Sequence, residues 1–258
     1  MRRVFSFLLA FGLLFVSCRA EVREISALRE ILPELTPGTL LVLDLDNTLI
    51  RPAGNLGSDQ WYYFLVRKFR ERDGLSAAAA EHAAMALWNR VQPSLRMQTV
   101  EPETARVIRA EQNRGLLTLG LTARTPDIAG TTIAQLRGVG VNLARHTVPT
   151  RNVTWPTATP VLFKRGVLFV GEGHEKGRAL LQFLQFAGLR PARIVFLDDK
   201  RGHVVSVDRA ARAAGVPCVA FRYSATDRWV EEFNADTHDL DLFLGKPSRR
   251  VPASSTRP

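Results

Sequence analysis

The sequence predicts an α/β protein with a Rossmann-like parallel sheet and helices on both faces. Short, continuously apolar runs indicate strands that are buried on both faces. Segments with helical spacing alternate with these runs, which favours parallel strands joined by crossover helices. Three of the runs also end on polar side chains, at the edge where such sheets bind ligands. The candidate strands are residues 39–46, 116–124, 192–199 and 216–223.

The size and composition are those of a globular protein with one substantial core and a small insert. The chain has 258 residues, of which 46% are hydrophobic and 23% charged. The net charge of +10 comes from scattered basic residues, nearly all arginine. This excess would help to attract anionic substrates or acidic surfaces. Since no basic run is interleaved with aromatic residues, we expect no nucleic-acid partner.

The first twenty residues have the pattern of an export signal. Arg2 and Arg3 precede an apolar run that is followed by small residues, which predicts a signal peptide over 1–20. Cleavage after Ala20 would give a soluble periplasmic or secreted chain. The segment "FVSC" instead resembles an imperfect lipobox, in which a lipidated Cys18 would attach the mature chain to a membrane. An uncleaved membrane anchor is a further alternative, although the apolar run is short for a membrane span. The remaining cysteine, Cys218, is expected to be a small core residue without a disulfide partner.

The rest of the chain divides into a main domain over 21–245 and a disordered tail over 246–258. Helical spacing between residues 21 and 35 places Ile25, Leu28, Ile31 and Leu32 on one face. Residues 55–103 are mostly helical and would form a small helical cap insert, whose first helix begins after Ser58 and ends at Gly74. Two apolar runs around Lys164, Arg165 and Gly166 predict a hairpin.

The polar residues at the strand ends predict a metal site. Asp44 and Asp46 end the first strand, Thr122 ends the second, and Asp198 and Asp199 end the third. Adjacent parallel strands would bring these groups to one edge of the sheet. Four carboxylates there repel one another, and a hard divalent cation such as Mg²⁺ would relieve the repulsion. We therefore predict Asp44, Asp46, Asp198 and Asp199 as metal-binding residues.

The same residues suit phosphoryl transfer. Asp44 would be the nucleophile and form an acyl-phosphate, while Asp46 would act as general acid and then as base for water. Thr122, with Ala123 beside it, would bind a phosphoryl oxygen, and Lys176 would neutralise the transferring group. Lys164 and Lys200 are alternatives to Lys176 in that role.

Four segments resemble, in order, the motifs of the haloacid-dehalogenase-like (HAD) hydrolase superfamily. They are "DLDNT" from Asp44, "LTAR" with Thr122, "KG" at Lys176 and "FLDDK" with Asp198 and Asp199, spread over a core of about residues 38–225. The resemblance implies Mg²⁺-dependent transfer through an aspartyl-phosphate, and the presence of Asp46 implies a phosphatase rather than a dehalogenase. The signal, helical insert and hairpin resemble an uncharacterised exported bacterial branch.

Each residue also has a purely structural interpretation. The two acids could occupy an ordinary turn, Thr122 could cap a helix, and Lys176 could be solvated. Aromatic residues of the insert are expected to form its packing core, with one or two of them lining the substrate pocket: Trp61, Tyr62, Tyr63, Phe64 and Trp88. A second function hypothesis is an exported or lipid-anchored protein that binds a phosphorylated ligand without turnover. The sequence leaves open the substrate, the oligomeric state, and whether Asp198 or Asp199 touches the metal.

Overall fold

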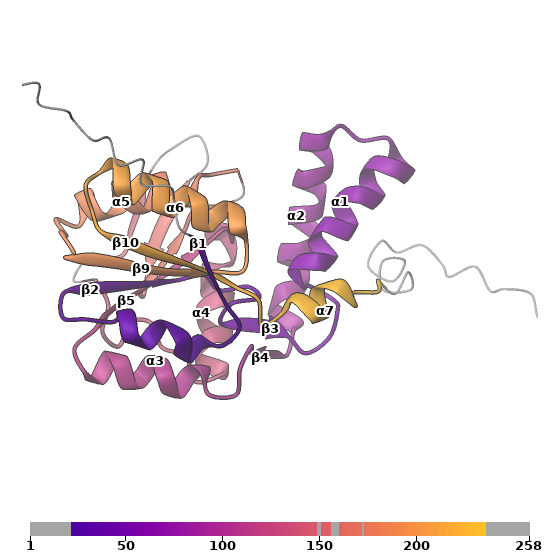
Figure 1. The fold of residues 1–258 in the computed structure, drawn as a ribbon. Helices are drawn as coiled ribbons and strands as arrows, with labels where there is room; N and C mark the ends of the chain where they lie inside the picture. The colour runs from indigo at the N-terminus through magenta and orange to yellow at the C-terminus, as the bar shows by residue number, and fades with distance from the viewer. Residues whose placement is uncertain (1–21, 149–150, 156–159, 172, 236–258) are drawn as a thin grey trace, which may run out of the picture.

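The fold is built on one eight-stranded sheet, in the order β1-β10-β9-β2-β5-β8-β7-β6 (Figure 1). The computed structural model describes residues 22–148, 151–155, 160–171 and 173–235. The predicted signal over 1–20, with Cys18, and the predicted tail over 246–258 lie outside these residues. The strands are β1 Val22–Ile25, β2 Thr39–Leu43, β5 Leu117–Thr122, β6 Val153–Trp155, β7 Val161–Lys164, β8 Val167–Phe169, β9 Arg193–Asp198 and β10 Cys218–Tyr223.

The central strands are parallel, as the sequence predicted. Strands β5, β2, β9 and β10 lie side by side and run in the same direction, so their carboxyl ends meet at one edge. All five residues of β2 are buried, because the strand is covered on both faces and flanked on both sides. Among the strands that the structure describes, β7 alone runs against the others, and it pairs antiparallel with β6 on one side and β8 on the other.

Helices cover both faces of the sheet, which confirms the predicted fold class. On one face α5 and α6 pack over alternate strand residues such as Leu40 and Val42. On the other, α3, α4 and a 3₁₀ helix pack over Leu41 and Leu43. Figure 1 shows these two layers above and below the sheet. The described helices outside the predicted insert are η1 Leu28–Glu34, α3 Thr104–Asn113, η3 Pro126–Ile128, α4 Ala129–Gly138, α5 Lys176–Phe186, α6 Arg201–Ala213 and α7 Asp227–Glu231.

The N-terminal segment differs from the sequence prediction. The predicted single helix over 21–35 is instead the edge strand β1 followed by the 3₁₀ helix η1. Strand β1 pairs in parallel with β10, from Val22 against Ala220 to Ile25 against Tyr223. The free edge of β10 therefore supplies backbone hydrogen bonds that outweigh the local helical spacing. Leu28 and Ile31 are still buried against the sheet, but from a tighter helix than expected.

The predicted insert contains a helical hairpin of α1 Asp59–Asp73 and α2 Ala77–Val91, followed by η2 Gln92–Ser94. The Ser58 side chain caps α1 by accepting from the Trp61 amide at 3.0 Å, and Gly74 ends it with a left-handed φ of 67°. The hairpin has its own apolar core and stands to one side of the sheet (Figure 1). It is joined to the main domain by a two-stranded ribbon that the sequence did not reveal, β3 Ile50–Pro52 with β4 Met97–Thr99.

The predicted hairpin around residues 164–166 is present as β7 and β8. Its turn places Arg165 at φ 49° and Gly166 at φ 84°. Two consecutive residues with positive φ match the twist of a tight antiparallel connection. Strand β8 then pairs in parallel with β5, so the hairpin extends the central sheet.

Candidate active site

Three neighbouring strands deliver acidic and hydroxyl side chains to one edge of the sheet. Asp44 directly follows β2, Thr122 ends β5, and Asp198 ends β9. The Asp44 amide continues the ladder by donating to the Leu197 carbonyl at 2.9 Å. Asn47 then turns the chain back with a φ of 58°. The sheet therefore brings together the residues that the sequence predicted at its carboxyl edge.

Lys176 lies between two of these acids. Its Nζ donates to Asp44 Oδ1 and, at 2.7 Å, to Asp198 Oδ2. The Lys176 side chain is only 1% exposed, because it reaches inward from the first residue of α5. The other oxygen of Asp44 accepts from the Thr48 hydroxyl at 3.1 Å. The solvated alternative for Lys176 does not describe this structure.

Burial and neighbouring charges separate the pKa values of the two acids. Burial raises the pKa of Asp44 to about 6; the Asp198 charge adds to this, and the Lys176 ammonium opposes it. Burial would also raise the pKa of Asp198, but Lys176 and His203 outweigh it and lower the pKa. Burial would lower the pKa of Lys176, yet Asp198 and Asp44 outweigh it and raise the pKa. Lys176 and Asp198 are therefore ionised at neutral pH.

Asp199 extends the acidic group beside them. Its Oδ2 accepts from Asn47 Nδ2 at 3.3 Å, and its amide donates to the Thr48 hydroxyl at 3.2 Å. Burial, followed by the charges of Asp198 and Asp44, raises the pKa of Asp199 well above its usual value. Crowding of this kind is what a bound cation would relieve.

The acidic group has the composition of a magnesium site. Asp44, Asp198 and Asp199 each offer a carboxylate oxygen, and these oxygens lie within 4.8 Å of one another. With all three carboxylates ionised and Lys176 protonated among them, the set would carry two net negative charges, which a divalent cation would balance. Oxygen ligands suit Mg²⁺. The donor set therefore fits the predicted metal. The carboxylate of Asp46 lies outside this group, so its predicted part in metal binding stays a prediction.

Asp46 instead forms a bidentate ion pair with Arg124. Arg124 Nε and Nη2 donate to the two Asp46 carboxylate oxygens, both at 2.7 Å. Arg124 is 3% exposed and is held by further bonds to Thr132 and Gln135 on α4. Sequence reasoning missed Arg124, although it stands two residues after Thr122 in "LTAR". Its place in the sequence, just after a strand that ends at the predicted acidic site, could have indicated an ion pair with one of the acids.

Thr122 and Ala123 are at the same edge. Thr122 is buried, and its Oγ1 accepts from the Arg124 amide at 3.1 Å, which leaves the hydroxyl proton free to be donated. Ala123 is half-buried in the turn that follows. Their binding to a phosphoryl oxygen stays a prediction.

The two alternative lysines are placed differently. Lys200 Nζ pairs with Asp59 at 3.0 Å and donates to the Tyr63 hydroxyl at 2.8 Å, so it joins the main domain to the first turn of α1. Lys164 ends β7, three strands away from β2 in the sheet. Neither replaces Lys176 beside Asp44.

The aromatic residues of the insert mostly pack with one another, as predicted. Trp61, Tyr62, Phe64 and Trp88 are buried in the hairpin core. Tyr63 is 46% exposed and lies against Lys200. Trp88 also lies over the Arg124 guanidinium, whose Cζ is 5.1 Å from the ring centre. The aromatic residues that touch the site region are therefore at the base of the hairpin.

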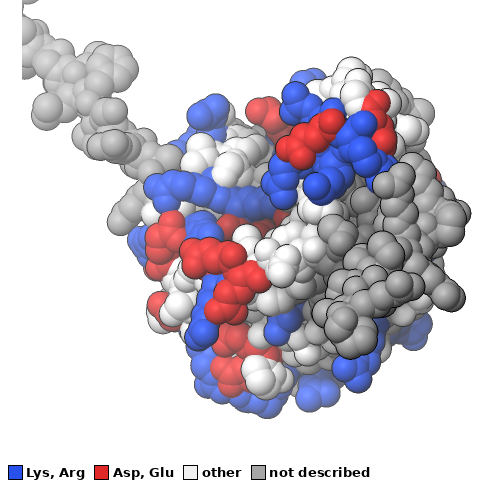
Figure 2. Space-filling model, turned by 90° about the vertical axis from the view of Figure 1, so that its right-hand side faces the viewer, with Lys and Arg blue, Asp and Glu red and all other residues white. Residues whose placement is uncertain are grey.

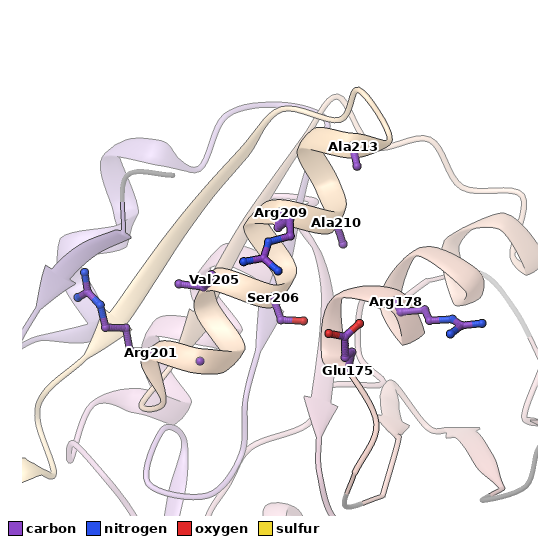
Figure 3. Close-up of a pocket in the computed structure, with 9 residues that line it drawn as sticks. Glu175, Arg178, Arg201, Val205, Ser206, Arg209, Ala210 and Ala213 are labelled. Atoms are coloured by element: carbon purple, nitrogen blue, oxygen red, sulfur yellow. The ribbon is translucent and has the colours of Figure 1, made fainter. Parts of the chain in front are cut away.

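A separate cavity of about 600 Å³ lies between α5 and α6. Arginines 178, 201 and 209 line it, together with Glu175 and Ser206. Figure 3 shows that the three guanidinium groups point in different directions. Arg201 is also paired with Glu24 at 2.8 Å. The cavity therefore does not gather positive charge around a single point.

The surface charge is also dispersed on the side that carries the hairpin. Figure 2 shows basic and acidic side chains interspersed there. Within the described part of the chain, no helix combines the length and apolarity that crossing a bilayer requires. The predicted absence of a nucleic-acid partner stays a prediction.

Together the fold and the site define a class: an α/β protein with a buried acidic centre at the carboxyl edge of a mostly parallel sheet. The family model described as "Protein of unknown function (DUF2608)" matches residues 21–243. The chain belongs to this family.

Two similar proteins come from chlamydiae. A "Putative outer membrane protein" of Chlamydia pneumoniae is 27% identical over 224 residues, covering 86% of this chain and 84% of the relative. A protein of the same description from Chlamydia trachomatis is 22% identical over 186 residues, covering 72% of this chain and 69% of the relative.

Among solved structures, the chain is similar to a "Putative Phosphatase from Clostridium difficile". The identity is 12%, the TM-score is 0.44, and the match covers 80% of this chain and 98% of the other. It is also similar to a "Hydrolase, haloacid dehalogenase-like family protein" from Streptococcus pneumoniae, with 13% identity, a TM-score of 0.42, and coverage of 80% and 97%.

Proposed function

We propose that this protein is an exported, Mg²⁺-dependent phosphatase that hydrolyses a small phosphomonoester through an aspartyl-phosphate on Asp44. The observation that carries the proposal is the convergence of buried Asp44, Lys176 and Asp198 with half-buried Asp199, with Thr122 at the same edge of the sheet. Sequence motifs alone leave this convergence open. The description of the chlamydial relatives as outer membrane proteins supports export.

In the first step Asp46 starts as the protonated carboxyl. An Asp44 carboxylate oxygen attacks phosphorus, the bond from phosphorus to the ester oxygen breaks, and the leaving alcohol takes the proton from Asp46, which becomes the carboxylate that Arg124 binds in the structure. In the second, Asp46 removes a proton from water, and the water oxygen attacks phosphorus. Inorganic phosphate leaves, and the Asp44 carboxylate is restored. Lys176 holds Asp44 in place and offsets charge on the phosphoryl group.

Asp44, Asp198 and Asp199 would hold the metal. When bound, Mg²⁺ would supply positive charge to the phosphoryl oxygens. Thr122 and Ala123 would also bind the phosphoryl group.

The test is phosphate release by the mature chain, residues 21–258, from a panel of phosphomonoesters with Mg²⁺ or with EDTA. We expect Mg²⁺-dependent turnover that Asp44→Asn lowers by roughly a thousandfold or more, since it removes the nucleophile. The matched control is Asp127→Asn, because Asp127 is exposed in η3. Turnover that survives Asp44→Asn would overturn the proposal. Tight binding of a phosphorylated ligand without turnover would favour the non-catalytic alternative.

Mass spectrometry of the natural N-terminus decides between the two processing routes. A lipidated first residue at Cys18 would indicate a membrane-anchored enzyme, and a free Glu21 would indicate a soluble one.

A further inference from the structure

We propose that Trp88 is a positioning residue: through Arg124, the base of the helical hairpin sets the orientation of Asp46. This inference rests on the proposed function, because Asp46 is the predicted proton donor and acceptor there. It adds a residue from the insert whose aromatic face acts on the site without touching substrate.

The orientation of Asp46 depends on Arg124. Two parallel bonds of 2.7 Å join the guanidinium to both carboxylate oxygens, so the planes of the two groups are fixed relative to each other. A single bond would leave the carboxylate free to rotate. Asp46 is partly exposed, with a side chain 19% accessible, so it borders the solvent side of the site rather than its floor.

Arg124 is in turn held in place by its surroundings. Its Nη1 donates to Thr132 Oγ1 at 3.0 Å and to Gln135 Oε1 at 2.6 Å, both on α4. The Trp88 ring contacts the guanidinium with 5.1 Å between Arg124 Cζ and the ring centre. Arginine stacks well on tryptophan, and the contact is stronger when it is shielded from water, as here. The α4 side chains hold the edge of the guanidinium, and Trp88 holds its face.

The position of Trp88 depends on the position of the hairpin. Its Nε1 donates to the Ser58 carbonyl at 3.1 Å, which ties α2 to the start of α1. The adjacent Asn89 donates to Thr125 Oγ1 at 3.0 Å, in the loop that follows β5. Movement of the hairpin base away from this loop would therefore remove Trp88 from Arg124.

A second connection runs beside the first. Gln135, which accepts from Arg124, also donates to the Gln92 carbonyl at 2.8 Å. Gln92 in turn donates to the Gly57 carbonyl at 2.9 Å. The hairpin base thus contacts both the face of the Arg124 guanidinium and one of its hydrogen-bond partners. The contacts that hold the hairpin against the main domain are therefore the same contacts that hold Arg124, and through it Asp46, in position.

The test compares two substrates that differ in their need for a proton. The leaving group of 4-nitrophenyl phosphate departs as a stable anion, whereas the alkoxide of glycerol phosphate requires a proton from Asp46. We expect Trp88→Leu to lower kcat for glycerol phosphate by roughly 10- to 100-fold more than for 4-nitrophenyl phosphate. KM should change little for either substrate, and Trp88→Phe, which keeps an aromatic face, should restore part of kcat.

The matched control is Phe69→Leu. Phe69 is buried in the same hairpin core but lies near the far end of α1, so its loss should weaken the hairpin without the substrate-dependent effect. Arg124→Gln should reproduce the Trp88→Leu pattern, and the double variant should be no worse than Arg124→Gln alone. An equal loss for both substrates, or multiplicative losses in the double variant, would overturn the inference.

A second measurement needs no turnover. In nitrogen-15 NMR spectra, the Arg124 Nε–H should give a signal protected from exchange by its bond to Asp46 and absent in Arg124→Lys. We expect that signal to disappear in Trp88→Leu and to remain in Phe69→Leu. If it persists in Trp88→Leu, the inference is wrong, whatever the activity. If the wild-type chain releases no phosphate while the signal behaves as expected, the proposed function fails and the structural coupling stands.

Discussion

Replacing Lys176 with methionine tests the electrostatics of the acidic site without any substrate. The ammonium lies between Asp44 and Asp198 and is 1% exposed. Methionine has a similar length but no charge, so the variant leaves two carboxylates facing each other out of water. Breaking a buried ion pair by removing one partner costs roughly 3–5 kcal/mol. Because Lys176 serves two acids, we expect a loss of unfolding free energy near the upper end of that range at pH 7.

The loss should depend on pH. In the variant, the pKa values of Asp44 and Asp198 in the folded state should both lie above the pKa of an aspartate in the unfolded chain. At pH values above the unfolded-state pKa, the variant therefore loses unfolding free energy, and it regains this free energy as the pH falls and the two carboxylates are protonated. In the wild type, the raised pKa of Lys176 gives stability that is present below its unfolded pKa and lost only at alkaline pH. The lowered pKa of Asp198 gives stability that is lost only in strong acid. The raised pKa of Asp44 in the wild type, about 6, also lets wild-type stability recover as the pH falls from 8 to 5, but the recovery should be larger in the variant, where no ammonium opposes the rise of either pKa. The difference in unfolding free energy between wild type and variant should therefore narrow by about 1 kcal/mol or more from pH 8 to pH 5.

The measurement is urea unfolding followed by tryptophan fluorescence at both pH values. Lys164→Met is the matched control, because Lys164 is a partly exposed lysine at the end of β7 and should cost less than about 1 kcal/mol. If Lys176→Met loses as little unfolding free energy as the control, or if its loss does not change with pH, the expected electrostatics are refuted.

Two further predictions concern other parts of the fold. Burial raises the pKa of the Cys218 thiol to about 12. At pH 8, alkylation by iodoacetamide should therefore be about a thousandfold slower in the folded mature chain than in the chain unfolded by guanidinium. Equal alkylation rates would contradict this prediction. In α5, a Cβ on Gly177 would lie 2.2 Å from the Ser206 carbonyl oxygen, so Gly177→Ala should lower the unfolding free energy by roughly 2 kcal/mol or more. Gly130→Ala, at a helical glycine with open space, is the control and should be neutral or slightly stabilising, so similar values for the two variants would count against the steric clash.

Several parts of the fold could be predicted because their signals are local. Strands buried on both faces are continuously apolar, so β2, β5, β9 and β10 stand out along the chain. Helix ends could be placed from Ser58 and Gly74, because capping and left-handed φ angles depend on residue type at one position. The N-terminal strand β1 could not be predicted in this way. Its hydrogen bonds come from β10, roughly two hundred residues further along the chain.

The sequence by itself determined which groups end the central strands, and the parallel sheet then required Asp44, Thr122 and Asp198 to share an edge. Tertiary structure alone decided how the charges at that edge are paired. Lys176 reaches Asp44 from 132 residues away, and Arg124 reaches Asp46 from 78 residues away. The physical reason is that an ion pair depends on distance and burial in space, whereas residue order records only neighbours along the chain. In the folded chain, the two acids of "DLD" therefore pair with different basic side chains. Asp44 pairs with buried Lys176, and Asp46 pairs with Arg124, which packs against Trp88.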